Sequence, residues 1–166
     1  MKAVLMSTQP KWCELIARAI NPVMYSVFKT IEVRKTRPKL ETPFKVYIYC
    51  THGVVWADYC RFVKDGRGKV IGEFVCSEIT VAERGNYCVL PKAKTMIDEL
   101  DLLEYANEKT VYGWHISKLE IYDTPKELSV FRKPIVCHRG KQRFNCEGCW
   151  DCEITRPPQS WCYVEE

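Results

Sequence analysis

Alternating apolar and polar residues recur in short stretches along the chain and predict a fold built mainly of strands. In residues 28–39, FKTIEVRKTRPK, the side chains of Ile31 and Val33 share one face and those of Glu32 and Arg34 share the other, because successive side chains of a strand point to opposite sides. Further strands are predicted at residues 2–7, 45–50, 70–83, 112–123 and 161–166. Within the longest apolar-rich strand, Gly72 indicates a bulge or a close approach of another segment.

Two stretches have helical spacing instead. Pro10 suits the first turn of a helix, and apolar residues follow it at intervals of three or four up to Ile20. Residues 95–109 repeat this pattern with Met96, Leu100 and Leu103. Because too little helix separates the strands for repeated βαβ units, we predict an α+β fold, a small mixed β-barrel with about two flanking helices.

The composition fits one domain spanning residues 1–166, with a Cys-rich insertion at about 132–158. An apolar fraction of 46% in 166 residues supports a single core. The longest apolar runs reach five to seven residues, well short of the ~20 that a membrane span needs. The first ten residues also lack the apolar core of a signal peptide. We therefore expect a cytoplasmic protein that makes no membrane contact.

Positive charge is concentrated in two segments. The net charge is +4; residues 29–45 hold six cations against two acids, residues 126–143 hold six against one, and the last 23 residues carry a net charge of −4. The cations Lys35, Arg37 and Lys39 have two possible roles. They either contact the phosphates of a nucleic-acid backbone or protect an edge strand from pairing with another chain.

Aromatic residues allow two similar interpretations. Each ring either stacks on a base or packs in the core. The residues concerned are Trp12, Tyr47, Tyr49, Trp56 and Trp114.

The ten cysteines divide into two groups. Six are scattered among apolar neighbours and are interpreted as buried thiols: Cys13, Cys50, Cys60, Cys76, Cys88 and Cys162. The other four are Cys137, Cys146, Cys149 and Cys152, and the last three have C-x2-C-x2-C spacing. Closely spaced thiolates suit a tetrahedral metal ion, so we predict a site for zinc, ahead of an iron–sulfur cluster, with His138 as an alternative to Cys137. The alternative is a set of free surface thiols.

Four sequence blocks together resemble a known family. In order, they are STQPKWCELIARAI, FKTIEVRKTRP, GKVIGEF and YGWHISKLEIYD. They resemble the ASCH family, a branch of the PUA-like superfamily of compact β-barrels, and the ending RPPQSWCYVEE is similar to that of small ASCH-like proteins of phages and prophages. Lys29, Glu32 and Arg34 fall on the last three fixed positions of the family's G-x-K-x-x-E-x-R hallmark, while Val27 stands in place of its glycine.

The resemblance implies a role with RNA or nucleotides, with the hallmark residues lining a cleft of the barrel. One branch of the family hydrolyses an acetylated cytidine with a lysine that activates a threonine three positions later. The present chain has Glu32 at that position. A carboxylate cannot replace the attacking hydroxyl, although it can act as a base toward water.

Three functions remain open on these grounds. The first is binding of RNA or a modified nucleotide in a basic cleft by Lys29, Arg34, Lys35, Arg37 and Lys39. The second is hydrolysis of an acetylated nucleoside or an RNA phosphodiester by Lys29, Glu32 and Arg34, so whether the chain is an enzyme is undecided. The third is a phage-type module that binds a protein partner. Against all three stands an ordinary solvated strand with a Glu–Arg surface pair.

The orientation of residues 31–34 follows from the barrel prediction. We expect Ile31 and Val33 to point into the barrel. Glu32 and Arg34 should then face a cleft that also contains Lys29 and an aromatic ring.

Overall fold

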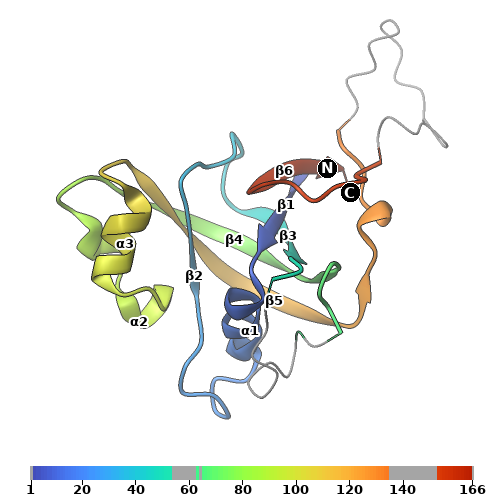
Figure 1. Ribbon diagram of the computed structural model, residues 1–166, viewed down its shortest axis with the longest axis horizontal. Helices are drawn as coiled ribbons and strands as arrows, with labels where there is room; N and C mark the ends of the chain where they lie inside the picture. The colour runs from blue at the N-terminus through green and yellow to red at the C-terminus, as the bar shows by residue number, and fades with distance from the viewer. Residues whose placement is uncertain (1, 54–62, 64, 135–152, 166) are drawn as a thin grey trace, which may run out of the picture.

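The computed structural model describes residues 2–53, 63, 65–134 and 153–165. Its centre is a mixed six-stranded sheet of order β2-β5-β4-β3-β1-β6 (Figure 1). The strands are β1 (Lys2–Thr8), β2 (Ile31–Arg34), β3 (Phe44–Cys50), β4 (Val70–Ala82), β5 (Val111–Lys126) and β6 (Trp161–Glu165). Strands β1 and β3 pair in parallel, and the other neighbours are antiparallel. The α+β class and the predicted strands are therefore confirmed.

Helices are short and lie at the ends and faces of the sheet. The α-helices are α1 (Pro10–Ala17), α2 (Lys92–Thr95) and α3 (Glu99–Ala106), and the 3-10 turns are η1 (Arg18–Ile20), η2 (Tyr87–Val89) and η3 (Leu128–Val130). The helix predicted at residues 95–109 is confirmed only as α3. Met96 has a left-handed backbone (φ 58°) and ends α2. No helix in the described part of the chain is long and apolar enough to cross a membrane.

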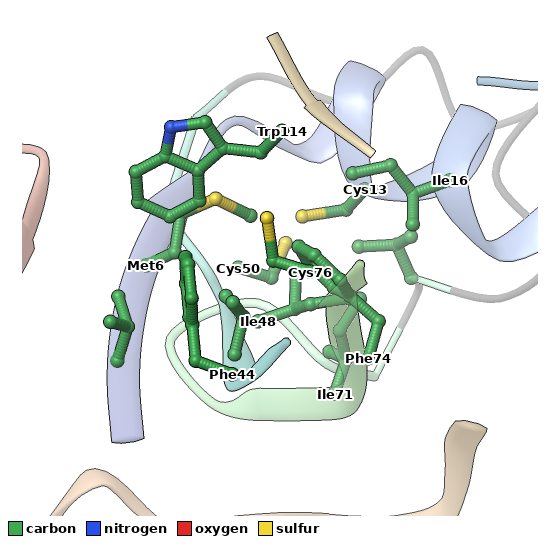
Figure 2. Close-up of a cluster of buried hydrophobic side chains, with 13 residues drawn as sticks. Met6, Cys13, Ile16, Phe44, Ile48, Cys50, Ile71, Phe74, Cys76 and Trp114 are labelled. Carbon is green, nitrogen blue, oxygen red and sulfur yellow. The ribbon is translucent and has the colours of Figure 1, made fainter. Parts of the chain in front are cut away.

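The main core lies on one face of the sheet, beneath α1. Figure 2 shows Trp114 beside the sulfur atoms of Met6, Cys13, Cys50 and Cys76, which point toward one another. The three cysteines of this group are free and fully buried, as predicted. Burial of thiols among apolar neighbours is common because Cys packs as a small hydrophobe.

Two of the other predicted buried thiols differ in their exposure. Cys88 is exposed and Cys162 is half-buried, so the prediction is wrong for Cys88. It lies in the short turn η2, which has a single buried residue, Tyr87. Cys60 falls outside the described residues.

The predicted orientation of β2 is wrong. Ile31 and Val33 pack against Leu102 and Ala106 of α3 in a separate apolar cluster. Glu32 is paired in register with Trp114, a member of the main core. The polar face of β2 therefore points toward the main core, because α3, together with Tyr87 and Leu90, provides a second apolar surface on the other side. Figure 1 shows α3 beside β2.

The bulge predicted at Gly72 is confirmed. The register between β4 and β5 shifts between Val70 and Gly72. A Cβ atom added at Gly72 would lie 2.3 Å from the main-chain oxygen of Glu120. A side chain at this position would therefore push β4 away from β5.

The described strands do not form a closed ring of ladders. Strands β2 and β6 are the two ends of the sheet order. Strand β1 has β3 and β6 as its neighbours, and β2 has β5 alone. The side chain of Arg34 reaches across this gap to Ser7 and Thr8 of β1 and to Ser160 just before β6.

Candidate functional site

Lys29, Glu32 and Arg34 form one buried ionic cluster. One carboxylate oxygen of Glu32, Oε1, lies 2.8 Å from Nη2 of Arg34, and the other, Oε2, lies 3.4 Å from Nζ of Lys29. Lys29, Glu32 and Arg34 are only 1%, 5% and 8% exposed, respectively. Strand alternation brings Glu32 and Arg34 to one face, and Lys29 enters the same cluster from the residues just before β2. The surface ion pair that was the ordinary alternative is therefore excluded.

The amine of Lys29 is held by groups from both flanking helices. Nζ donates a hydrogen bond of 2.5 Å to the main-chain oxygen of Thr95 in α2, and it lies 4.8 Å from the ring centre of Trp12 in α1. The main-chain nitrogen of Lys29 also donates to the oxygen of Leu15. Burial lowers the pKa of Lys29, Glu32 raises it in part, and Arg34 lowers it further. The expected aromatic ring beside Lys29 is thus Trp12.

Arg34 connects β2 to the opposite side of the site. Its Nη2 donates to the main-chain oxygen of Ser7 and to Oγ1 of Thr8, each at 2.9 Å. Its Nη1 makes longer contacts, of 3.4 and 3.5 Å, with the main-chain oxygen and Oγ of Ser160. The buried Nε has no hydrogen-bond partner among the described residues. The guanidinium therefore holds one buried donor without an acceptor among the described residues.

Four of these partners were missed by the sequence reasoning: Ser7, Thr8, Thr95 and Ser160. Ser7 and Thr95 accept through main-chain oxygens, which every residue type possesses. No sequence signal could therefore have identified them. Thr8 contributes a hydroxyl at the end of β1, but a threonine at a strand end is too common to indicate a site.

Two aromatic rings flank the cluster, and each is paired with an exposed lysine. Trp12 is half-buried and has Nζ of Lys11 4.7 Å from its ring centre. Tyr105, on α3, has Nζ of Lys35 4.8 Å from its ring centre. Burial raises the pKa of Tyr105, while Arg34 lowers it, so this phenol lies within the electrostatic range of the cluster. The rim of the cluster therefore consists of two cation–aromatic pairs.

The predicted basic residues lie on an exposed loop that continues from β2. Lys35, Arg37 and Lys39 are all exposed. The loop is tied to β6 at two points, by a 2.9 Å bond from Trp161 Nε1 to Oγ1 of Thr36 and by a 2.7 Å bond from the main-chain nitrogen of Lys39 to the Tyr163 hydroxyl. The three cations are thus presented on an anchored segment next to the ionic cluster.

Most of the predicted stacking residues are buried. Tyr47, Tyr49 and Trp114 are 9%, 3% and 0% exposed and belong to the apolar clusters, so their rings cannot receive a base. Trp12 remains available at the rim. Trp56 falls outside the described residues.

The predicted metal ligands Cys137, Cys146, Cys149 and Cys152, and the alternative His138, also fall outside the described residues. Within the described part of the chain, no group of three or more His, Cys, Asp or Glu residues is placed to hold a metal ion. The zinc site therefore remains a prediction from cysteine spacing.

The arrangement favours anion binding over base catalysis by Glu32. Both carboxylate oxygens are engaged by cations, so neither faces a reacting water molecule. When all three groups are ionised, the cluster carries one positive charge in excess. A buried excess charge with an unpaired donor attracts an anionic or strongly polar group.

Comparison with known proteins identifies the fold. No protein-family model and no curated protein sequence matches the chain. Among solved structures, the chain is similar to the ASCH protein of Zymomonas mobilis, with a TM-score of 0.57, 14% identity, and 99% of this chain and 88% of that chain covered. A tyrosine-to-phenylalanine variant of that protein gives a TM-score of 0.63 at 15% identity, covering 100% of this chain and 92% of that chain. A serine-to-alanine variant gives 0.62 at 15% identity, with 99% and 89% covered. The chain therefore has the ASCH fold, as its sequence motifs predicted.

Proposed function

We propose that the chain binds RNA or a modified nucleotide at the outer edge of the Lys29–Glu32–Arg34 cluster. The observation that carries this proposal is the unpartnered Nε of Arg34 in a buried cluster with two cations and one carboxylate. A phosphate or a base carbonyl would supply the missing acceptor. Arginine is well suited to this role, because its planar fork matches phosphate oxygens and base edges.

The surroundings of the cluster support a nucleic-acid ligand. The exposed cations Lys35, Arg37 and Lys39 continue the positive surface beyond Arg34, where they can neutralise successive phosphates. Trp12 and Tyr105 border the same cluster, and aromatic rings of this kind accept unpaired bases by stacking. The surroundings of the cluster thus offer cations for phosphate groups and aromatic rings for bases.

The test is a measurement of RNA affinity against salt concentration. Fluorescence anisotropy with labelled single-stranded and hairpin RNA should give an affinity that falls steeply between about 50 and 200 mM salt, because bound cations release condensed counterions. A parallel titration with nucleosides and nucleoside monophosphates distinguishes a polymer from a nucleotide ligand. An absence of binding by every one of these ligands at low salt would refute the proposal.

Hydrolysis is a second candidate because burial lowers the pKa of Lys29. A lysine with a depressed pKa is a better base near neutral pH. The candidate substrates are an acetylated nucleoside and an RNA phosphodiester. Release of acetate from acetylcytidine, and cleavage of labelled RNA, would be followed with the wild type and Lys29→Met. Turnover by the wild type that is lost in this variant would establish catalysis. If neither protein shows turnover, binding is the only function that remains of the two.

A zinc ion is proposed as a structural cofactor of the Cys-rich insertion. The support is the C-x2-C-x2-C spacing of Cys146, Cys149 and Cys152, together with Cys137. Four thiolates would complete the tetrahedral set that structural zinc prefers.

A further inference from the structure

A hollow of about 430 Å³ is lined by none of the three residues of the ionic cluster, although its lining includes Phe28 and Thr30 on either side of Lys29. It is bordered on one side by Ile20 and Phe28, which flank the loop after η1, and on the other by Ile116 and Leu119 of β5. The lining also contains Lys118 and has no carboxylate. The hollow therefore combines apolar side chains with the hydroxyls of Thr30 and Ser117 and one positive charge.

The loop beside the hollow exposes large apolar side chains. Val23 is 96% exposed, Met24 is 64% exposed, and Ile20 and Val27 are about half exposed, at 47% and 49%. The loop has a defined turn, because the main-chain nitrogens of Met24 and Tyr25 both donate to the oxygen of Asn21 at 3.1 Å. Contiguous apolar surface on this scale marks an interaction site more often than a solvent-facing loop.

The backbone of β5 is distorted at Lys118. This residue has a left-handed φ of 46° inside a strand, a conformation that costs free energy for a bulky side chain. The register with β4 shifts here, so that Lys118 and Leu119 face the single residue Phe74. A bulge of this kind redirects a side chain relative to the regular pleat. The distortion places Lys118 in the lining of the hollow.

Lys118 also lacks a counter-charge. Among the described residues, no carboxylate lies within ion-pair distance of its amine. The nearby cation Arg18 differs, because its Nε lies 3.2 Å from a carboxylate oxygen of Glu14. The exposed amine of Lys118 is thus the charge in the lining that a ligand can neutralise.

We propose that this hollow, together with the Ile20–Val27 loop, docks a segment of a partner protein that carries apolar side chains beside an aspartate or glutamate. The apolar side chains contact Val23, Met24 and the floor of the hollow, and the carboxylate pairs with Lys118. Charge complementarity disfavours a symmetric dimer through this hollow, because the same lining in another copy presents a lysine and no carboxylate. The site is separate from the proposed RNA contacts.

The experiment selects peptides from a phage-displayed library of random 12-residue sequences on the full chain. Counter-selection uses a double variant, Val23→Ser with Met24→Ser. The expected peptides combine two or more large apolar residues with Asp or Glu. The most enriched peptide, labelled with a fluorophore, should bind Lys118→Glu at least about tenfold more weakly than the wild type. Lys109→Glu, an exposed substitution elsewhere, is the matched control and should leave the affinity unchanged.

Three further measurements test the site and its occupant. Peptide-induced shifts of the amide signals of Val23 and Lys118 in ¹⁵N NMR spectra would support the site without any variant. Failure to enrich peptides, or binding that is indifferent to Lys118, would overturn the proposal. A dimer in sedimentation velocity that Val23→Ser abolishes would assign the surface to self-association instead. Loss of RNA binding in Lys118→Glu would assign it to nucleic acid.

Discussion

The guanidinium of Arg34 donates to the main-chain oxygen of Ser7 at 2.9 Å and so connects β2 to β1, two strands that share no ladder. The same guanidinium contacts Glu32 at 2.8 Å. One side chain thus bridges the sheet and neutralises the central carboxylate of the cluster. Any ligand that binds Arg34 must do so without breaking these contacts, which leaves the unpartnered Nε and the longer Ser160 contacts at Nη1.

Arg34→Ala should lower the free energy of unfolding by about 3–5 kcal/mol, because it leaves the buried charge of Glu32 with only Lys29 as a partner. Urea unfolding followed by circular dichroism measures the change. The free energy of unfolding of Arg34→Lys should lie between those of the wild type and Arg34→Ala. An amine keeps the charge but cannot reach Ser7 and Thr8 together. Arg37→Ala is the matched control, and this exposed substitution should change stability by no more than about 0.5 kcal/mol. Equal stabilities for Arg34→Ala and Arg37→Ala would show that the bridge contributes nothing.

The sequence predicted the separation of faces on β2 but not which face is inside. Alternation places Ile31 and Val33 opposite Glu32 and Arg34 whatever the fold, and the structure agrees. The usual assumption that apolar residues face the main core failed here. Two apolar clusters exist on opposite sides of this strand, and the ionic groups satisfy one another well enough to be buried against the larger one.

The helix at residues 95–109 illustrates a different limit. Two of its predicted apolar positions, Leu100 and Leu103, are 79% and 45% exposed. The residues of α3 that pack in the apolar cluster are Leu102 and Ala106. Met96, chosen as the first apolar position, instead adopts a left-handed conformation after a separate turn of helix. A single methionine in that conformation has no sequence signal, because glycine and asparagine are the residues that usually adopt it.

The basic loop should determine how RNA binding depends on salt. Replacing Lys35, Arg37 and Lys39 by Gln should reduce the slope of log affinity against log salt by about 2, at about 0.7 for each lost phosphate contact on a single strand. Stability should be unaffected, because all three residues are exposed. Arg84→Gln, an exposed substitution in a residue paired with Glu108, is the control and should preserve the slope. An unchanged slope in the triple variant would exclude this loop from the RNA contact.

The Cys-rich insertion should carry about one zinc ion per chain. Elemental analysis of protein purified without added metal measures the content, and Cys146→Ser with Cys149→Ser should abolish it. Cys88→Ser is the control, because Cys88 is an exposed free thiol that is not among the predicted ligands. Metal-free wild-type protein whose four thiols react rapidly and whose unfolding is unaltered by a chelator would identify them as free surface thiols.

Lys29 should titrate at a pH below the ordinary lysine value of 10.5. Burial is the main cause of its lowered pKa, and Glu32 opposes this effect by raising the pKa. The change is observable in the ¹³Cε signal of Lys29 as pH increases. Glu32→Gln should lower the pKa of Lys29 further, since it removes the negative charge and leaves the amine beside Arg34. A Lys29 signal that titrates at the ordinary value of 10.5 or above would contradict the burial observed here.

The same shift has a consequence for stability. Because the pKa of Lys29 is lower in the folded chain than in the unfolded chain, the unfolded chain binds more protons at pH values between the two. The free energy of unfolding should therefore gain a contribution from Lys29 that increases as pH rises from its folded pKa toward 10.5. Lys29→Met, which keeps most of the buried volume, should lack this contribution. Urea unfolding of both proteins at several alkaline pH values gives the difference directly, because alkaline effects at other groups are common to both. A difference that stays constant or decreases with pH would mean that the amine of Lys29 gains more from Glu32 and Thr95 than it loses by burial.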